Sequence, residues 1–403
     1  MNQLHSFDGF IDKHSSSQSP RLAHDSLLTP IGCRSFASKI VTDTLVVDKK
    51  NRQLPSLKIG YLPLVDSAPL IIAHENGYFA DYDLQVALRR ESNWSSLRKR
   101  IAERDLDAAQ AICSLPILMT LGVDCSPCPT ITSLILSLNG DGIILSSRLM
   151  KRLATEAGSL RDLVKQIKPR KLVFGIVSYH SPQHLLTRNW LATQGVNPER
   201  EAKFVIVPTS QMSPHLKAGH LDGFSAGEPW NTLAALQGMG VCVASSRTIQ
   251  PNHPGKVLMM RKDWAESNPE NHVKMVKALL KACRYCQNPE NRPHIADTLA
   301  LPHYLNLSRK VLMTSLVQAT IPPKSELYAG SWQTFYDDLA NQPSLDKAAW
   351  IIQHLADQQI VNTGEVSIND LGKSVFSMPP YQEAIRQLER EPRVTVPSCS
   401  VAA

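Results

Sequence analysis

Residues 57–88, with the sequence LKIGYLPLVDSAPLIIAHENGYFADYDLQVAL, decide the fold of this chain. Leu57–Leu62 is a short apolar run that predicts a buried strand. The segment Asp66-Ser67-Ala68-Pro69 opens a helix over Leu70–Asn76, and the glycine directly after it is placed to end that helix. Leu84–Leu88 alternates between apolar and polar side chains, as a second strand would. The stretch therefore predicts a βα unit that leads into another strand.

The same alternation continues down the chain. Short apolar runs alternate with helical segments, which indicates α/β layers with mainly parallel sheets. Two such series predict two lobes and a cleft, and open α/β sheets bind ligands beyond the carboxyl ends of their strands. From about 262 to 390 the pattern is mostly helical. The other expected elements are helices Ser95–Arg104, Leu115–Leu121, 159–168, His184–Gln194 and Gln211–Ala218, and strands Leu106–Ala111, Ile131–Leu138, Gly142–Leu145, Lys171–Val177, Phe204–Val207 and Gly223–Ser225.

The composition is that of a soluble globular protein. The 403 residues are 43% apolar and 20% charged, and the length suits two domains of ordinary size. The net charge is +7, but no run of Lys and Arg is dense enough to predict nucleic-acid binding. No segment approaches the ~20 consecutive apolar residues of a membrane-spanning helix. We expect no direct contact with nucleic acid and no membrane partner.

The N-terminal region shows no export signal. Residues 1–40 are polar and rich in Ser and His, and they lack the apolar core of a secretory signal. Cys33 follows Ile31-Gly32 in a polar setting unlike a lipobox. As written, the sequence predicts a cytoplasmic protein with a disordered polar leader over residues 1–56. The alternative is a true start codon elsewhere, with an export signal before the body.

Eight cysteines include two C-x-x-C pairs, Cys125/Cys128 and Cys283/Cys286. Such pairs raise a four-thiolate zinc site as an alternative, but they lie too far apart for a zinc ribbon. The second pair falls on a helical pattern, where positions i and i+3 share a face and a small apolar side chain suits the core. We expect reduced structural thiols, with no metal and no cofactor.

Several short sequence motifs follow one another in the order and with the spacing that are typical of one protein family. Over roughly residues 57–300, the chain resembles the solute receptors that bind nitrate and bicarbonate. This resemblance implies a two-lobed, periplasmic-binding-protein-like α/β fold of type II, with the ligand in the inter-lobe cleft. The matching segments are Gly60–Leu70, Ala73–Phe79, Glu91–Trp94, Asp105–Ala109, Leu136–Gly140, Thr187–Leu191, Val207–Met212, Gly227–Asn231, His253–Lys256 and Met260–Trp264.

The resemblance and the element pattern together predict the domain organisation. Residues 57–145 form the first part of lobe I, and residues 146–260 form lobe II. Residues 261–390 return to lobe I as helices, and residues 391–403 are a tail.

The missing export signal selects a branch within the resembled family. Exported members feed ABC transporters, whereas members without the signal resemble NasS-type nitrate/nitrite sensors. The resemblance implies that such a sensor holds an RNA-binding antiterminator of the ANTAR type, a NasT-like protein, and releases it when the anion binds. The alternative is the substrate-binding component of a nitrate/nitrite ABC transporter.

Lys256 and Trp94 are the first candidate ligand-binding residues. A buried oxyanion needs directed donors and a nearby cation. In the resembled family, the position after His-Pro-x carries lysine in nitrate-type sites and an acidic residue in bicarbonate-type sites, which makes Lys256 the candidate cation. Trp94 can donate through its indole N–H and form a wall of the pocket. The alternatives are a solvated lysine in a loop after Pro254 and an aromatic side chain of the core.

Gln183 and His184 lie at the start of a helix, where backbone N–H groups favour anions. The resembled family has a histidine at the position aligned with Gln183, and this sequence has its histidine one residue later. Which of the two side chains faces the ligand is therefore open. A capping or surface role for His184 is the alternative.

Three further residues follow from the resemblance. Asn139 falls where the family contributes a loop amide or a glutamine, and Pro208 and Gln211 line the next strand-to-helix turn by analogy. Asp141, close by, would repel an anion unless it is turned away or protonated. Glu228 is expected to brace the hinge or a lysine.

Enzyme motifs are absent from the sequence. It has no G-x-G-x-x-G, phosphate loop, H-E-x-x-H or G-x-S-x-G. Gly219–Gly223 contains a histidine and an aspartate, but it resembles the segment that leads into a strand of a binding lobe. We expect a binding protein, not an enzyme, that works by ligand-driven hinge closure.

Overall fold

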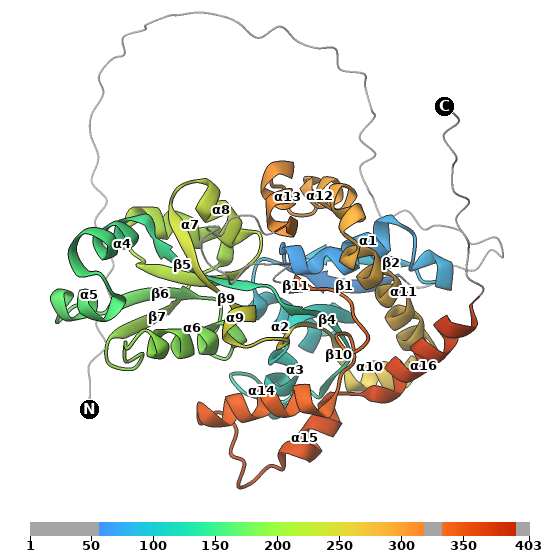
Figure 1. Ribbon diagram of the computed structural model, residues 1–403. Coiled ribbons are helices and arrows are strands. Elements are labelled where there is room, and N and C mark those ends of the chain that lie inside the picture. Colours follow the sequence, from blue (N-terminus) through green and yellow to red (C-terminus); the bar gives the residue numbers. More distant parts are fainter. Residues whose placement is uncertain (1–55, 318–332, 392–403) are drawn as a thin grey trace, which may run out of the picture. The chain divides into compact units, whose positions relative to one another are not determined.

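The computed structural model describes residues 56–317 and 333–391. The expected leader and tail lie outside the described residues, apart from Ser56 and Glu391. In the described part, the named strands form two sheets of six and five strands with helices packed against them (Figure 1).

The first sheet has the strand order β11-β4-β10-β3-β1-β2. β1 (Leu57–Tyr61) pairs in parallel with β2 (Val86–Arg90) and β3 (Ala108–Ile112), which are the strands of the opening βα units. β10 (Pro254–Arg261) lies between β3 and β4 (Thr130–Asn139) and runs antiparallel to both. The edge strand β11, Gln333–Thr334, is antiparallel to β4.

The second sheet has the order β7-β6-β8-β5-β9. β6 (Leu172–Ile176) is parallel to β7 (Ala202–Ile206) and to β8 (Gly223–Gly227). β5 (Asp141–Ser146) is antiparallel to β8 and to β9 (Gly240–Ser245). We call the first sheet with its helices lobe I, and the second sheet with its helices lobe II.

Both sheets are mixed, so the expectation of mainly parallel sheets is wrong. The chain passes from lobe I to lobe II between β4 and β5, and it returns from β9 to β10. The returning strand runs opposite to the outgoing one, which makes β10 antiparallel to β4. Neither crossing contains the long helical connection that a parallel pair needs.

The first crossing occupies Asn139 and Gly140, whose φ angles are 56° and 94°. The strands expected on either side, Ile131–Leu138 and Gly142–Leu145, correspond to β4 and β5, which belong to different sheets. The second sheet begins at Asp141 and the first resumes at Pro254, whereas the expected lobe boundaries are 145 and 260. The difference arises because the apolar run of β5 continues that of β4, and because no strand was predicted over residues 254–261.

Helices cover both faces of the first sheet (Figure 1). Alternate residues of β10 enter separate cores: Val257 and Met259 pack in one, Leu258 and Met260 in the other. Helices α2, α3, α14 and α15 contribute to the first core, helices α1, α11, α12, α13 and α16 to the second, and α5 and α6 to the core of lobe II. The helix bounds are α1 (Ala68–Glu75), α2 (Trp94–Ala102), α3 (Leu115–Leu121), α4 (Ser147–Arg152), α5 (Leu160–Ile167), α6 (Pro182–Thr193), α7 (Thr209–Ala218), α8 (Trp230–Leu236), α9 (Ser246–Ile249), α10 (Lys262–Ser267), α11 (Pro269–Gln287), α12 (Arg292–Ala300), α13 (Arg309–Val317), α14 (Leu345–Asp357), α15 (Ile368–Val375) and α16 (Met378–Arg390).

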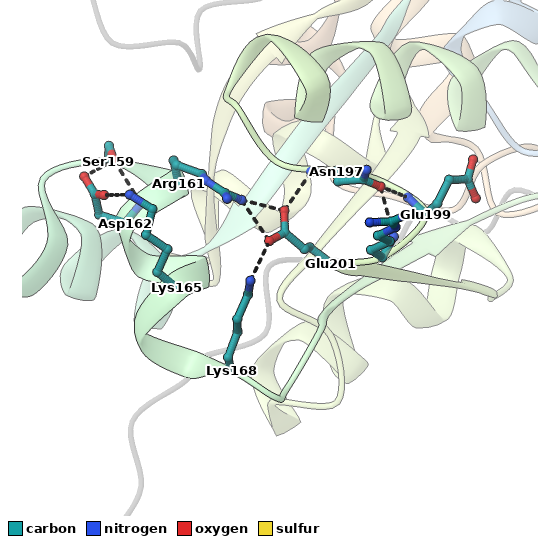
Figure 2. A network of polar contacts seen from close by, with 9 residues as sticks. Ser159, Arg161, Asp162, Lys165, Lys168, Asn197, Glu199 and Glu201 are labelled. Carbon is teal, nitrogen blue, oxygen red and sulfur yellow. Dashed lines mark hydrogen bonds and ion pairs between the residues drawn. The ribbon is translucent and has the colours of Figure 1, made fainter.

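A polar network ties α5 to the segment before β7 (Figure 2). Arg161 Nη1 donates to both carboxylate oxygens of Glu201 at 2.8 and 2.6 Å, and Lys168 Nζ lies 3.3 Å from the same carboxylate. The backbone N–H of Asn197 also donates to it, and this bond, together with the two basic side chains, lowers the pKa of Glu201 to about 2. The carboxylate is therefore charged at neutral pH and braces this edge of lobe II.

The six cysteines in the described part are free thiols. Cys283 and Cys286 are buried on α11, in agreement with the helical pattern of the sequence. No group of three His, Cys, Asp or Glu side chains suited to a metal ion occurs among the described residues. Across 56–317 and 333–391, no helix combines the length and apolarity needed to cross a bilayer.

Candidate functional site

A cavity of about 400 Å³ lies between the carboxyl ends of strands from both lobes. Leu62 and Ile112, at the ends of β1 and β3, belong to its wall in lobe I. Val177 and Val207, just beyond β6 and β7, belong to its wall in lobe II. This is the position at which open α/β sheets bind ligands. A larger and more open hollow of about 600 Å³ lies elsewhere, and none of the predicted site residues lines it.

Trp94 and Pro208 line the same cavity, one from each lobe. Trp94 is the first residue of α2, and the side chain of Asn93 caps this helix by accepting a hydrogen bond from the backbone N–H of Ser96 at 2.8 Å. Gln211 does not line the cavity. It is exposed, because α7 turns the neighbouring Met212 into the core instead.

One polar contact between side chains bridges the rim of this cavity. His180, which follows β6 in lobe II, places Nε2 3.0 Å from Oδ2 of Asp124, which follows α3 in lobe I. Both residues line the cavity, and the aspartate is largely exposed. The contact joins the two lobes across the entrance.

Lys256 lies deeper, within β10, and its side chain is 1% exposed. Its Nζ is 2.9 Å from Oδ2 of Asp66 and 3.8 Å from Oδ1 of Asp141. Asp66 lies on the short helix Val65–Ser67 after β1, and Asp141 is the first residue of β5. The ammonium group therefore connects lobe I to lobe II. The expected cation is present, but two buried carboxylates already surround it.

Two glutamines complete the contacts of these carboxylates. Gln110, on β3, donates through Nε2 to Oδ1 of Asp66, and its Oε1 accepts from the backbone N–H of Leu62 at 3.0 Å. Gln183, on α6, donates through Nε2 to Oδ1 of Asp141 at 2.8 Å. We call Asp66, Gln110, Asp141, Gln183 and Lys256 the junction cluster.

Burial and charge pull in opposite directions within the junction cluster. Burial alone would lower the pKa of Lys256, but the nearby Asp141 and Asp66 outweigh it and raise that pKa, so the lysine is charged. Burial raises the pKa of Asp66, although Lys256 acts in the opposite direction. The cluster thus contains one fixed cation and a carboxyl group that takes up a proton more readily than usual.

Gln183 and His184 point to different surroundings. Gln183 contacts Asp141, whereas the ring of His184 packs edge-on against Phe204 with 4.5 Å between ring centroids. Nδ1 of His184 lies 2.7 Å from the carbonyl oxygen of Tyr179, and burial lowers the pKa of the ring to about 4. His184 is therefore neutral and belongs to the core of lobe II. Of the two, Gln183 is the residue at the junction.

Buried polar atoms near Lys256 lack hydrogen-bond partners within the described residues. The atoms without a partner are Nδ2 and Oδ1 of Asn139, Oε1 of Gln183, Oγ of Ser137 and Nε2 of His253. Ser137 lies opposite Lys256 in the pairing of β4 with β10, and the backbone N–H of Asn139 donates to the carbonyl of His253 at 3.0 Å. Buried polar groups are normally paired, so this set suits contact with a small polar molecule.

Sequence reasoning missed Asp66 and Gln110. Asp66 was assigned only to the start of a helix, although it follows directly on the first buried strand. A charged residue just past the carboxyl end of a strand was the available signal. Gln110 lies inside β3, and nothing in its local pattern marked it.

The model of the NMT1-like family matches residues 50–300. The chain belongs to the NMT1-like family. Among curated relatives, the nitrate import ATP-binding protein NrtC of Synechocystis is 36% identical over 75% of this chain and 46% of its own length. The bicarbonate-binding protein CmpA of Synechococcus elongatus is 27% identical over 66% of this chain and 61% of its own length.

A solved structure shows the fold of this NMT1-like chain. The periplasmic nitrate-binding protein NrtA from Synechocystis superposes with a TM-score of 0.77 at 23% identity, covering 84% of this chain and 90% of that one. The predicted two-lobed type II fold is thus confirmed, as is the resemblance to nitrate and bicarbonate receptors. The relatives named for binding also agree with the expectation of a binding protein and not an enzyme. The chain spans about half the length of curated relatives such as NrtC.

Proposed function

We propose that this protein binds a small oxyanion, nitrate or nitrite, at the junction of its two lobes. The observation on which the proposal rests is the placement of Lys256, a buried cation that contacts residues of both lobes. The unpaired Nδ2 of Asn139 and Oγ of Ser137 belong to the same region and can donate directed hydrogen bonds. Relatives are named for nitrate and for bicarbonate, and the lysine in His253-Pro254-Gly255-Lys256 favours nitrate or nitrite by resemblance.

The same geometry supports a mechanism by hinge closure. Lys256 belongs to lobe I, and its partner Asp141 belongs to lobe II at the crossing from β4 to β5. A ligand that enters between them has different contacts in the open and closed forms, which is the condition for shifting their populations. As the cavity closes, Trp94 of lobe I and Pro208 of lobe II face each other across it.

We further propose that this closure is read as a signal. In this proposal the protein is a cytoplasmic sensor that sequesters an ANTAR-type, NasT-like RNA-binding antiterminator and releases it when nitrate or nitrite binds. Its support is the resemblance to a receptor family that includes NasS-type sensors, together with the contacts of Lys256 to residues of both lobes. Release requires that the antiterminator bind the open form more tightly than the closed form.

The second candidate is a receptor that delivers the anion to an ABC transporter. The names of the relatives favour it, since NrtC is an import component and NrtA is periplasmic. In that case the lobes would close on the anion for delivery, and no regulator would bind.

Calorimetry tests the binding step. We expect titration with nitrate and nitrite to give saturable binding that is lost in Lys256→Met and weakened in Trp94→Phe, which keeps an aromatic side chain but removes the indole N–H. Lys203→Met, at an exposed position of β7, is the matched control and should bind as wild type does. Unchanged nitrate affinity in folded Lys256→Met would contradict the proposed site.

A pull-down distinguishes the sensor from the receptor. The tagged full-length chain should retain the antiterminator in the absence of anion and release it at millimolar nitrate. Fractionation of the producing cells should place the protein in the cytoplasm. Recovery in the periplasm, with no antiterminator retained, would favour the receptor.

A further inference from the structure

The junction cluster has more negative than positive charge. Lys256 is its single cation, and the carboxylates of Asp66 and Asp141 lie 2.9 and 3.8 Å from its Nζ. Within the described ranges, neither aspartate forms an ion pair with any other cation. All three side chains are at most 3% exposed, so solvent does little to screen them.

The groups that face the cluster from other elements do not supply a second positive charge. Gln110 and Gln183 are neutral donors, one to each aspartate. His253 precedes β10, and burial lowers the pKa of its ring, which keeps it neutral. Burial raises the pKa of the Cys113 thiol to about 12 and that of the Glu228 carboxyl to about 7. Neither of these groups can offset the charge of an anion.

The excess of negative charge in the junction cluster opposes the binding of an anion. An oxyanion beside Lys256 would bring a third negative charge to one ammonium group in a site closed to water. Like charges at this separation repel strongly in a low-dielectric interior. Binding becomes favourable only when one of the two carboxylates is neutralised.

We infer that Asp66 takes up one proton from solvent when the oxyanion binds, so that the site accepts the anion and the proton together. The inference rests on the proposed function and names the condition under which that site can work. The proton converts the Asp66 carboxylate to the acid, and no other bond forms or breaks. Asp141 remains the partner of Lys256.

Asp66 is favoured over Asp141 for two reasons. Burial raises the pKa of Asp66, despite the opposing effect of Lys256. Asp66 is also the carboxylate in direct contact with the ammonium group, at 2.9 Å from Nζ against 3.8 Å for Asp141, so an oxyanion that binds the ammonium group displaces Asp66 from its cation. Once protonated, its hydroxyl can donate a hydrogen bond, which turns a repelling group into a donor for the oxyanion. Asp66 is thus a ligand-binding residue whose protonation decides whether the site accepts an anion.

Calorimetry of the full-length chain in buffers with different ionisation enthalpies measures the protons taken up. With nitrate at pH 8, we expect wild type to take up close to one proton per bound anion. Linkage then predicts that the affinity falls by up to about tenfold per pH unit at alkaline pH. Asp66→Asn should lose both the proton uptake and the pH slope and should bind nitrate more tightly than wild type at pH 8. Glu228→Gln, which removes another buried carboxyl of raised pKa, is the matched control and should keep the uptake.

The outcomes separate the inference from the proposed function. Anion binding without proton uptake in wild type, or an unchanged pH slope in Asp66→Asn, overturns the inference and leaves the proposed function standing. Transfer of the effect to Asp141→Asn also overturns it, since the proton would then belong to the other carboxylate. The absence of anion binding at every pH, in both wild type and Asp66→Asn, overturns the proposed function itself.

Discussion

At the scale of single residues, contacts with two carboxylates fix the side chain of Lys256. Its ammonium group is buried between two carboxylates from different lobes, and each carboxylate has a glutamine as a further partner. Transfer of such charges from water is costly, and only their mutual contacts offset that cost. Removing one partner therefore lowers the free energy of unfolding by more than the net contribution of the contact, because the other charge stays buried without a partner.

Lys256→Met should destabilise the protein by about 3–5 kcal/mol, because it leaves two buried carboxylates without their cation. Denaturant unfolding followed by circular dichroism measures this loss. The triple variant Lys256→Met/Asp66→Asn/Asp141→Asn should recover most of it, since no buried charge remains unpaired. Equal stability of the single and triple variants would contradict the account.

Glu228 should make stability depend on pH. Burial raises its pKa from 4.5 to about 7, and its carboxylate accepts a bond from the backbone N–H of Thr232. Between pH 4.5 and 7 the unfolded chain loses this proton while the folded chain keeps it, so stability falls as pH rises through that window. The expected loss is about 3 kcal/mol. Glu228→Gln should flatten the dependence in unfolding experiments across this range, whereas an unchanged curve would exclude Glu228 as its source.

At the scale of elements, helix caps and edge contacts hold the parts that support the site. Ser159 caps α5: its Oγ accepts from the backbone N–H of Asp162 at 3.1 Å and donates to the Asp162 carboxylate at 2.7 Å (Figure 2). The same helix is fastened to lobe II through Arg161 and Glu201. These contacts involve none of the residues that line the cavity between the lobes.

Ser159→Ala should lower stability by about 1 kcal/mol through the loss of the cap. Thermal unfolding measures the change. Nitrate affinity should stay at the wild-type value, because the helix N-terminus shares no contact with the junction cluster. A large change in affinity would show that the edge of lobe II is coupled to the site.

At the scale of the whole molecule, both lobes must meet for the site to exist. Lys256 with Asp141 joins them in the interior, and His180 with Asp124 joins them at the rim. The two contacts differ in exposure. The inner one is buried, whereas Asp124 is 65% exposed, so water screens the rim contact.

Asp124→Ala should therefore weaken nitrate binding by no more than about fivefold, which corresponds to about 1 kcal/mol. The loss should appear as faster dissociation in stopped-flow measurements, because the rim contact is made only when the lobes are close. Wild-type dissociation would show that the rim does not hold the cleft shut. A loss as complete as in Lys256→Met would move the main site to the rim.

Much of the fold follows from local patterns in the sequence. The quoted stretch 57–88 forms β1, α1 and β2 within a few residues of their expected bounds, because apolar runs and helix-ending residues act locally. Strand β10 was missed, since a buried strand in the middle of a sheet has no alternating pattern. Its place between β3 and β4 depends on pairing with residues more than a hundred positions away.

The candidate site, like the fold, was predictable from the sequence only in part. Its expected chemistry, a lysine with amide and indole donors, came from motifs such as His253-Pro254-Gly255-Lys256, whose resemblance to a family of solute receptors indicated a binding protein. Only the tertiary structure decided that Asp66 and Asp141 lie beside that lysine, that Gln183 and not His184 contacts Asp141, and that Gln211 stays in solvent. The physical reason is that a motif specifies which groups are present, whereas the charge of a site depends on which distant groups the folded chain buries beside them.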